Sequence, residues 1–266
     1  MNAITEILRD VLPPGIEIPE DISEERLVQR RSDAFNAHEG KLTGYDCPKC
    51  KNKGYISEVV DRIEVMHRCD CHLVRESLDR IERSGLDKLC KRCTFDSFVV
   101  TMPWQEIVLN EARAYAANPV GWYALTGQSG SGKTHICTAI TYTLIMNAHT
   151  GTYMLWTMES TQLKSLVGDA EAYSKRMNEL RTSDVLYIDD LFKGSCTAAD
   201  IKLAFDLLNS RAQSEKITII SSELTPEQLM NVDEALAGRI IEMCGCHYRC
   251  IKKNRQNNYR LRSTKL

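Results

Sequence analysis

The sequence lacks the long hydrophobic runs that are typical of membrane proteins. No apolar stretch in its 266 residues approaches the roughly 18 residues that a membrane-spanning helix needs. The first residues, MNAITEILRDVLPPG, have neither the basic start nor the long apolar core of a signal peptide. Internal repeats and low-complexity segments are absent as well. We therefore expect a cytoplasmic protein with no membrane partner.

Neither sign of charge dominates the composition. The chain has 34 basic and 36 acidic residues, a net charge of -2 and an ordinary hydrophobic content of 43%. The charges are unevenly distributed, however: residues 1–46 hold ten acidic and five basic side chains, whereas the stretch 251–266 has six basic residues and no acidic ones. Such a tail is typical of a segment that binds a polyanion, although a solvated chain end has the same composition.

A disulfide framework is not expected, although the chain has 11 cysteines. In a reducing compartment, clustered cysteines bind metal more often than they form disulfides, and an odd number cannot all be paired. Cys47 and Cys50 form a CxxC pair, and Cys69 and Cys71 form a CxC pair after an interval of 18 residues. Four thiolates at this separation favour a tetrahedral zinc site on a small ribbon, which has too few residues to bury a core without metal.

Alternatives to this zinc site remain open. The second pair departs from CxxC spacing, and His67 or His72 lies near enough in the sequence to replace one ligand. The same cysteines are compatible with free or redox-active thiols, or with another metal. Cys90 and Cys93 form a further CxxC without a matching second pair, so we interpret them as packed residues, or as ligands if the first set is misassigned.

The pattern of hydrophobic residues predicts two kinds of structure along the chain. Before residue 90 we expect short helices at Ile4–Leu12 and Ser23–His38, a hairpin made of Tyr55–Val59 and Ile63–His67, and a connecting helix that ends near Gly85. After residue 90, helical segments alternate with short apolar strands, which favours a parallel sheet covered by helices on both faces. The predicted strands are Trp122–Thr126, Thr152–Thr157, Val185–Asp189, Ile217–Ser221 and Tyr248–Ile251.

The sequence accordingly predicts three regions. These are a helical segment at 1–45, a zinc-binding module with a connecting helix at 46–89, and an α/β domain at 90–266.

The stretch GQSGSGKT matches the phosphate-loop pattern GxxxxGK[ST] and lies between a predicted strand and a predicted helix. Its glycines allow backbone N–H groups to surround phosphate oxygens, while Lys133 reaches the β and γ phosphates and the Thr134 hydroxyl ligates Mg²⁺. The helix that follows adds the positive end of its dipole. The predicted nucleotide-binding residues are Gly127, Gln128, Ser129, Gly130, Ser131, Gly132, Lys133, Thr134 and His135.

Two carboxylates and a polar tip complete the predicted site. Asp189, at the end of the apolar strand VLYID, is placed to hold Mg²⁺, and Asp190 to polarise the attacking water, unless Asp190 only caps a helix. Since Asp is one methylene shorter than Glu, turnover is expected to be slow. Ser222 is the predicted γ-phosphate contact at the tip of the strand Ile217–Ser221, and it ranks above Glu223, because a bare carboxylate would repel phosphate.

These motifs resemble those of a known family. GQSGSGKT, VLYIDDLF, IISSELT and ALAGRIIE stand in the order seen in AAA+ ATPases of the DnaC/DnaI type, the replicative-helicase loaders that include IstB-like proteins. The resemblance covers roughly residues 90–262, and CPKCKNKGYI…RCDC resembles the N-terminal region of Gram-positive and phage members. It implies a P-loop NTPase fold of the AAA+ (ASCE) class, preceded by a zinc-ribbon-like module, with ATP, Mg²⁺ and Zn²⁺ as cofactors.

The resemblance also implies partners. They are a replicative hexameric helicase of the DnaB type, single-stranded DNA and further copies of the chain in a ring or spiral. In such an assembly Arg239 matches the arginine finger, although a salt bridge to Glu234 or Glu242 is an alternative role. The chain departs from the family at Glu223, where an Asn or Asp is usual. Because only 27 residues of the sequence follow Arg239, we expect no helical lid there, as is common in loaders. Within 162–181, basic residues are the candidate DNA contacts, unless this is a solvated helix face. They are Lys164, Lys175, Arg176 and Arg181.

The leading interpretation is an ATP-dependent loader of a replicative helicase onto single-stranded DNA. An IstB-like transposition helper ATPase is the nearest alternative, although the predicted zinc module argues modestly against it. A small-molecule P-loop kinase needs an acceptor pocket and an arginine-bearing lid, neither of which the sequence indicates. A zinc-dependent nucleic-acid-binding protein with a weak ATPase is a third possibility, against which the intact Lys133, Thr134 and Asp189 count.

Overall fold

The computed structural model describes residues 24–84, 86–194 and 196–262. The chain divides into two compact units, of which the first ends at Arg75 and the second begins at Glu76. The division lies inside helix α3 (Cys71–Ser84) and therefore within the region 46–89 of the sequence prediction. The helix expected at Ile4–Leu12 lies outside the described residues. No helix among the described residues is long and apolar enough to cross a membrane.

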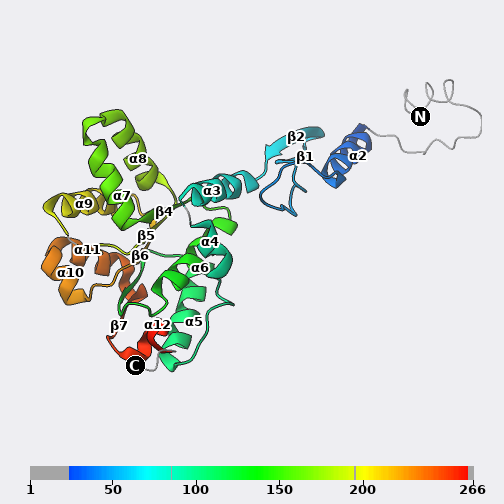
Figure 1. Ribbon diagram of the computed structural model, residues 1–266. Helices are drawn as coiled ribbons and strands as arrows, with labels where there is room; N and C mark the ends of the chain where they lie inside the picture. Colours follow the sequence, from blue (N-terminus) through cyan, green and yellow to red (C-terminus); the bar gives the residue numbers. More distant parts are fainter. Residues whose placement is uncertain (1–23, 85, 195, 263–266) are drawn as a thin grey trace, which may run out of the picture. The chain divides into compact units, whose positions relative to one another are not determined.

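The small unit consists of helix α2 (Glu24–Ala37), a hairpin of β1 (Tyr55–Val60) and β2 (Ile63–Arg68), and the first turn of α3 (Figure 1). The hairpin turns at Asp61 and Arg62, which both have positive φ, as a two-residue turn of the I′ type requires. Helix α2 is joined to β1 through Asn36, whose side chain both accepts from the Ser57 N–H and donates to its carbonyl. The predicted helix and hairpin are confirmed to within a residue at each end.

The large unit contains, among its described residues, a five-stranded parallel sheet in the order β4-β5-β6-β3-β7. Its strands are β3 (Tyr123–Gly127), β4 (Gly151–Leu155), β5 (Val185–Asp189), β6 (Ile217–Ser221) and β7 (Tyr248–Ile251). The last three match the prediction residue for residue. The second predicted strand starts one residue late and ends two residues late, because helix α7 already begins at Trp156, whose side chain is buried in the core.

Helices cover both faces of this sheet, as Figure 1 shows. They are α4 (Asp87–Arg92), α5 (Pro103–Ala117), α6 (Lys133–Met146), α7 (Trp156–Ser165), α8 (Ala170–Thr182), α9 (Ala198–Gln213), α10 (Pro226–Val232), α11 (Glu234–Cys244) and α12 (Tyr259–Arg262). Side chains of β5 alternate between the two cores: Val185 and Tyr187 pack with α5 and α6, while Leu186 and Ile188 pack with α7, α8, α9 and α11. The layered α/β prediction is confirmed.

Polar contacts hold together the ends of the sheet opposite the phosphate loop. Asp184, just before β5, accepts hydrogen bonds from Thr150 Oγ1 and Lys216 Nζ, both at 2.7 Å, so that it joins the starts of three strands. Arg211 of α9 is fully buried and donates to Thr218 Oγ1 and to backbone carbonyls of the turn before β5. Such a buried guanidinium is tolerated because its donors are satisfied.

Candidate nucleotide site and candidate metal centre

The phosphate loop runs from the end of β3 to the start of α6. Gly127, Gly130 and Gly132 have φ values of 90°, 70° and 93°, in the left-handed region where glycine is favoured. A side chain at Gly132 would also collide with the Phe98 ring, because its Cβ atom would lie only 2.8 Å from that ring. The glycine spacing read from the sequence therefore reflects backbone conformation and close packing together.

Lys133 lies against the carbonyl groups of its own loop. Its ammonium donates to the carbonyls of Gly127 at 3.1 Å and Gln128 at 2.7 Å, and only 5% of the residue is exposed. Burial lowers the pKa of Lys133, while Glu223 and Asp190 oppose this shift by attraction. The lysine is thus held in the loop, as the motif predicts, by acceptors that a phosphate would replace.

Asp189 and Thr134, the two predicted magnesium ligands, lie together. Thr134 Oγ1 donates to Asp189 Oδ1 at 3.1 Å, and the same oxygen accepts from the Tyr187 hydroxyl at 2.7 Å and from Ser221 Oγ. The Tyr153 hydroxyl donates to the other oxygen, Oδ2, at 3.2 Å. Burial raises the pKa of Tyr153 and Tyr187, and so does the neighbouring Asp189 carboxylate. These hydroxyls orient the Asp189 carboxylate, and neither tyrosine was among the residues singled out in the sequence.

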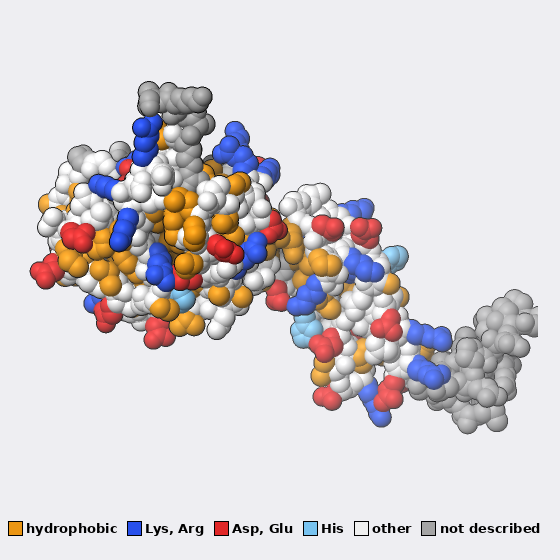
Figure 2. All heavy atoms as spheres, turned by 90° about the horizontal axis from the view of Figure 1, so that it is seen from below, with side chains coloured by type: hydrophobic (Ala, Val, Ile, Leu, Met, Phe, Trp, Pro, Cys, Tyr) orange, Lys and Arg blue, Asp and Glu red, His pale blue; other side chains and the backbone are white. Residues whose placement is uncertain are grey.

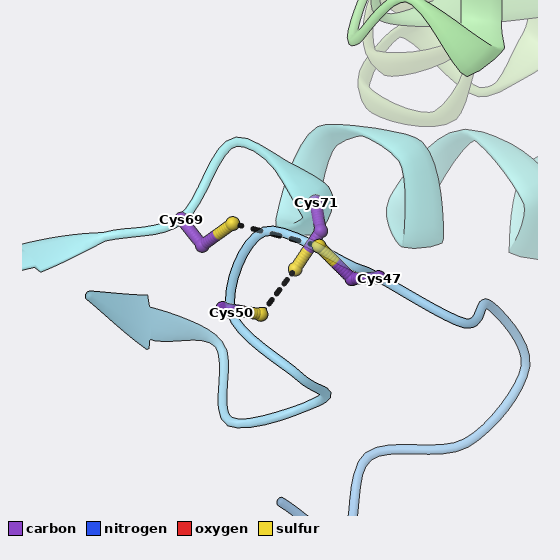
Figure 3. A group of neighbouring side chains, drawn as sticks. All are labelled: Cys47, Cys50, Cys69 and Cys71. Atoms are coloured by element: carbon purple, nitrogen blue, oxygen red, sulfur yellow. Dashed lines mark hydrogen bonds between the residues drawn. The ribbon is translucent and has the colours of Figure 1, made fainter. Parts of the chain in front are cut away.

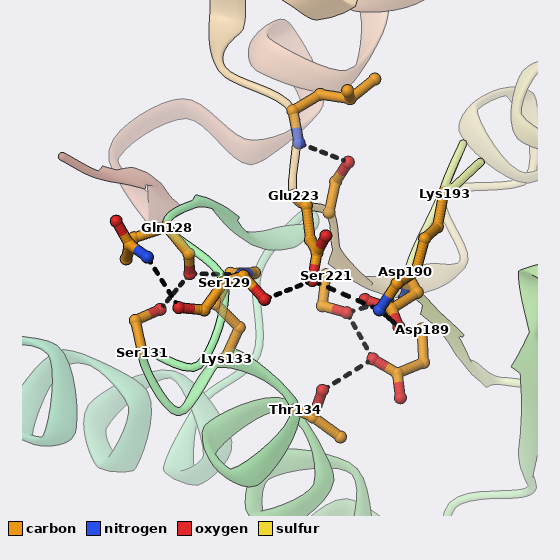
Figure 4. A network of polar contacts seen from close by, with 12 residues as sticks. Gln128, Ser129, Ser131, Lys133, Thr134, Asp189, Asp190, Lys193, Ser221 and Glu223 are labelled. Atoms are coloured by element: carbon orange, nitrogen blue, oxygen red, sulfur yellow. Dashed lines mark hydrogen bonds and ion pairs between the residues drawn. The ribbon is translucent and has the colours of Figure 1, made fainter. Parts of the chain in front are cut away.

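At the tip of β6, the Glu223 side chain approaches the phosphate loop (Figure 4). Glu223 Oε1 accepts a hydrogen bond from Ser129 Oγ at 2.7 Å. Ser222 is fully buried and donates to the Leu191 carbonyl at 2.8 Å, which directs its hydroxyl away from the phosphate loop. The sequence prediction placed Ser222 at the γ-phosphate and ranked Glu223 below it, whereas the contacts in the structure reverse that order.

Asp190 lies beside this contact, directly after β5. Its N–H donates to Ser221 Oγ at 3.0 Å, and its carboxylate pairs with Lys193 Nζ at 2.8 Å. Lys193 also lies 3.2 Å from Glu223 Oε1. Asp190 therefore belongs to a charged group at the mouth of the loop and does not act simply as a helix cap.

The His135 side chain points away from the phosphate loop, whereas the segment 251–259 contacts it. His135 Nε2 is 2.8 Å from the Thr94 carbonyl, and the ring lies edge-on to Phe98, so the side chain faces the segment before α5 and not the loop. On the opposite side, the Gln128 N–H donates to the Ile251 carbonyl at 2.9 Å.

Further along, the Tyr259 N–H donates to the Gly130 carbonyl at 2.8 Å. The Asn258 side chain fills the space that a Cβ at Gly130 would need. The C-terminal segment 251–259 therefore supports the phosphate loop directly.

Arg239 lies in α11, and 40% of its side chain is exposed. Its Nε is 3.9 Å from the Glu242 carboxylate, one helical turn away. The ion pair that the sequence left open as an alternative is thus present, although it is loose and solvated. Action in a neighbouring chain stays a prediction.

The four predicted zinc ligands converge in the small unit (Figure 3). Their ligand atoms all lie within 4.8 Å of one another, with Sγ–Sγ distances of 3.8 Å for Cys47–Cys69 and 3.6 Å for Cys50–Cys71. Tetrahedral thiolates at a Zn–S distance of about 2.3 Å are about 3.8 Å apart, so this donor set fits the ion. Among the described residues, no other group of cysteine, histidine or acidic side chains is arranged in this way.

Local structure brings these cysteines together. Cys47 and Cys50 lie in the loop before β1, where Lys51 and Asn52 both have positive φ and turn the chain sharply. Cys69 follows β2 and Cys71 begins α3, so the hairpin brings the second pair back to the first.

The alternative ligands lie outside the cluster. His67 is half-exposed and 3.4 Å from Glu58, whereas His72 Nδ1 is 2.8 Å from the Cys69 carbonyl. Cys90 is buried in the large unit, where burial raises the pKa of its thiol to about 12. It packs there as the sequence interpretation expected.

The predicted DNA segment carries fewer free charges than its sequence indicates. Lys164 Nζ pairs with Asp200 at 2.7 Å, and Arg176 pairs with Glu159 and Glu179, both at 2.7 Å. Figure 2 shows basic and acidic side chains interspersed on the face that it presents, without a single basic field.

Comparisons with known proteins agree with this geometry. The family model described as the bacterial DnaA ATPase domain matches residues 89–245, more than half of the chain. A curated relative, the phage-like element PBSX protein XkdC of Bacillus subtilis (strain 168), is 32% identical over 229 residues, or 80% of this chain and 85% of XkdC.

Two solved structures share the fold. The DnaC helicase loader has a TM-score of 0.56 at 19% identity and covers 63% of this chain and 99% of its own. AMPPCP-bound DnaA from Aquifex aeolicus has a TM-score of 0.54 at 18% identity and covers 64% of this chain and 52% of its own. The chain therefore belongs to the family of bacterial DnaA ATPase domains, and it is an ATP-binding AAA+ ATPase with the fold of the DnaC helicase loader.

Proposed function

We propose that the protein loads a replicative hexameric helicase onto single-stranded DNA and uses ATP hydrolysis as the switch that releases it. The observation that carries this proposal is the combination of an ATPase unit with the fold of the DnaC helicase loader and a second compact unit that has its own cysteine cluster. The DnaA-type family supports a role in DNA replication.

In this proposal the nucleotide site works through residues of the large unit. Lys133 and the backbone N–H groups of the phosphate loop bind the phosphates, and Asp190 orients the attacking water and accepts its proton. Thr134 and Asp189 would hold Mg²⁺, which neutralises charge on the phosphate oxygens. The contact between Thr134 Oγ1 and Asp189 Oδ1 supports this pairing.

The small unit supplies a rigid surface for the helicase. Zn²⁺ bound by the four cysteines would fix the loop before β1 against the start of α3, so that the unit keeps its shape while the ATPase unit changes. Arg239, which is partly exposed on α11, would reach the phosphates of a neighbouring copy in a ring or spiral.

Single-stranded DNA would lie on the ATPase unit. Lys175 and the basic C-terminal segment are the better candidates there, because Lys164 and Arg176 are engaged in ion pairs within the chain. Contacts of this kind should make affinity for single strands fall as salt is raised.

The test is reconstitution with the hexameric helicase of the natural host. Wild-type protein should transfer the helicase to closed circular single-stranded DNA when ATP is present. Asp190→Asn should still bind ATP and the helicase but should fail to release it, whereas Asp206→Asn on α9, outside the charged group, should behave as wild type. Loading by Asp190→Asn at the wild-type rate contradicts the proposal. Preferential binding of duplex DNA, with capture of a transposase, favours an IstB-like helper instead.

A further inference from the structure

Glu223 creates an electrostatic problem at the phosphate loop. Its carboxylate accepts from Ser129 Oγ, inside the loop that receives phosphate, and Asp190 adds a second negative charge beside it. A triphosphate brings further negative charge to the same place, and like charges at such distances repel strongly. Lys133 faces the loop carbonyls on the other side of the loop's opening. Besides Lys133 and the Mg²⁺ that Thr134 and Asp189 would hold, a further cation beside these two carboxylates therefore favours phosphate binding at the outer end of the site.

Lys193 is that cation. Its ammonium is 2.8 Å from Asp190 Oδ2 and 3.2 Å from Glu223 Oε1, so one lysine bridges both carboxylates. Hydrogen bonding to Asp190, followed by attraction to that carboxylate and to Glu223, raises the pKa of Lys193 against the effect of burial. Burial raises the pKa of Glu223, but hydrogen bonds from Ser129 and Lys193 outweigh it and leave that pKa lowered. Lys193 and Glu223 are thus both held in their charged forms.

The backbone between Asp190 and Lys193 is built to present this side chain. Asp190 and Phe192 both have positive φ, 57° and 58°, a conformation that costs non-glycine residues energy and recurs at functional sites. Leu191 and Phe192 compensate by inserting into the core, where Phe192 packs edge-to-face on Trp156. The Lys193 N–H closes the turn on the Asp190 carbonyl at 3.0 Å. The result is a short, tightly fixed turn that returns Lys193 over Asp190.

We propose that Lys193 is a specificity-determining residue of the nucleotide site, which contacts the terminal phosphate and makes the site favour a nucleoside triphosphate over a diphosphate. The terminal phosphate is the right partner because Lys193 pairs with Asp190, the residue to which the proposed function gives the attacking water. Lys193 at the same time neutralises Glu223, so that this carboxylate can stand at the tip of β6 without repelling the nucleotide. This inference rests on the proposed nucleotide site.

The experiment compares binding of AMPPCP and ADP, each with Mg²⁺, by calorimetry on the full chain. Lys193→Met should weaken AMPPCP binding about tenfold or more and ADP binding less than about threefold, because only the triphosphate reaches the lysine. Adding Glu223→Gln to Lys193→Met should restore AMPPCP affinity by several-fold, since it removes the repulsion that Lys193 otherwise neutralises. Lys193→Arg should keep most of the preference for the triphosphate.

Controls separate this inference from the site on which it rests. Lys193 is half-exposed, so its variants should melt close to wild type, and Lys202→Met, at an exposed position on α9, should bind both nucleotides normally. Equal losses for AMPPCP and ADP, or no change in either while wild type binds both, would overturn the role of Lys193 and leave the site intact. Failure of wild type to bind either nucleotide would overturn the site as well.

Discussion

Removal of the metal should unfold the small unit and leave the large one working. The buried apolar residues of the small unit are chiefly the four cysteines, with Tyr45 and Ile56 packed partly against them. Structural zinc contributes about 10–16 kcal/mol to folding in zinc-finger peptides, as much as or more than the whole stability of an ordinary domain, about 5–15 kcal/mol. Little stability is therefore left in this unit once the four sulfur atoms lose their ion.

The measurement has two parts. Elemental analysis should find about one zinc per chain, as one tetrahedral four-thiolate site requires, and the paired change Cys47→Ser and Cys69→Ser should abolish it. Hydrogen exchange should then show that amides of β1 and β2 lose protection after chelation or in the paired variant. Amides of β3 and β5 should keep theirs, and nucleotide affinity should change by less than about twofold, because the parallel sheet has its own core.

The control is Cys246→Ser, which removes an exposed cysteine of the large unit and should leave the zinc content unchanged. Full protection of the hairpin in metal-free protein would refute the reasoning, since it would show that the small unit folds without the ion. A preparation that carries no metal and four reactive thiols would refute the zinc assignment itself.

Three further predictions concern the large unit. Lys133→Ala should abolish measurable ATP binding or turnover, and wild-type hydrolysis by this variant would disprove the phosphate-loop assignment. Mixing Arg239→Ala chains with Lys133→Ala chains should restore ATPase activity, because some sites then combine an intact phosphate loop from one chain with an intact Arg239 from its neighbour. If activity does not recover although the two variants are shown to co-assemble, the role of Arg239 is limited to its ion pair with Glu242. Burial raises the pKa of Asp184, but hydrogen bonds from Lys216 and Thr150 prevail and bring it down to about 2. Because this pKa is lowered on folding, the stabilisation is present at neutral pH and is lost as the pH falls from about 4 through 2. Asp184→Asn should therefore cost roughly 1 kcal/mol at pH 7, reduced from the full shift because the side chain is 40% exposed, and the gap to wild type in urea melts should close by about pH 2. A gap that persists at low pH would mean that packing, and not charge, explains the loss.

The sequence was most informative where one short segment determines its own structure. Strands β5, β6 and β7 were predicted to the residue, and in β5 and β6 the reason is a mainly apolar run bounded by polar residues. The phosphate loop was predicted equally well, because the positive φ values of its backbone favour glycine at these positions. The CxxC and CxC pairs indicated the cysteine cluster for the same reason, because a hairpin between them returns the chain on itself.

The rest of the site depends on segments that only the sheet order brings together. Tyr153 reaches Asp189 because β4 and β5 are neighbours, which no spacing within either strand reveals. Successive residues at a strand end point in opposite directions, and the registration of β6 decides that Glu223, and not Ser222, meets the loop. The ion pairs of Lys193 with Asp190 and Glu223 depend on the positive φ values of Asp190 and Phe192. Amino-acid propensities do not predict a left-handed backbone at these two residues.

The position of β3 in the sheet has a consequence for how the protein is made. The phosphate loop follows β3, yet both strands that flank β3 come from far downstream: Tyr123 pairs with Ile219, and Ala124 with Tyr248. Tyr259, still closer to the chain end, contacts the loop itself. During translation at about 5–20 residues per second, the loop is therefore complete in sequence several seconds before its supports have left the ribosome. The nascent chain should stay unable to bind nucleotide until β7 and Tyr259 have been made, so a ribosome that stalls before them leaves a product without ATPase activity.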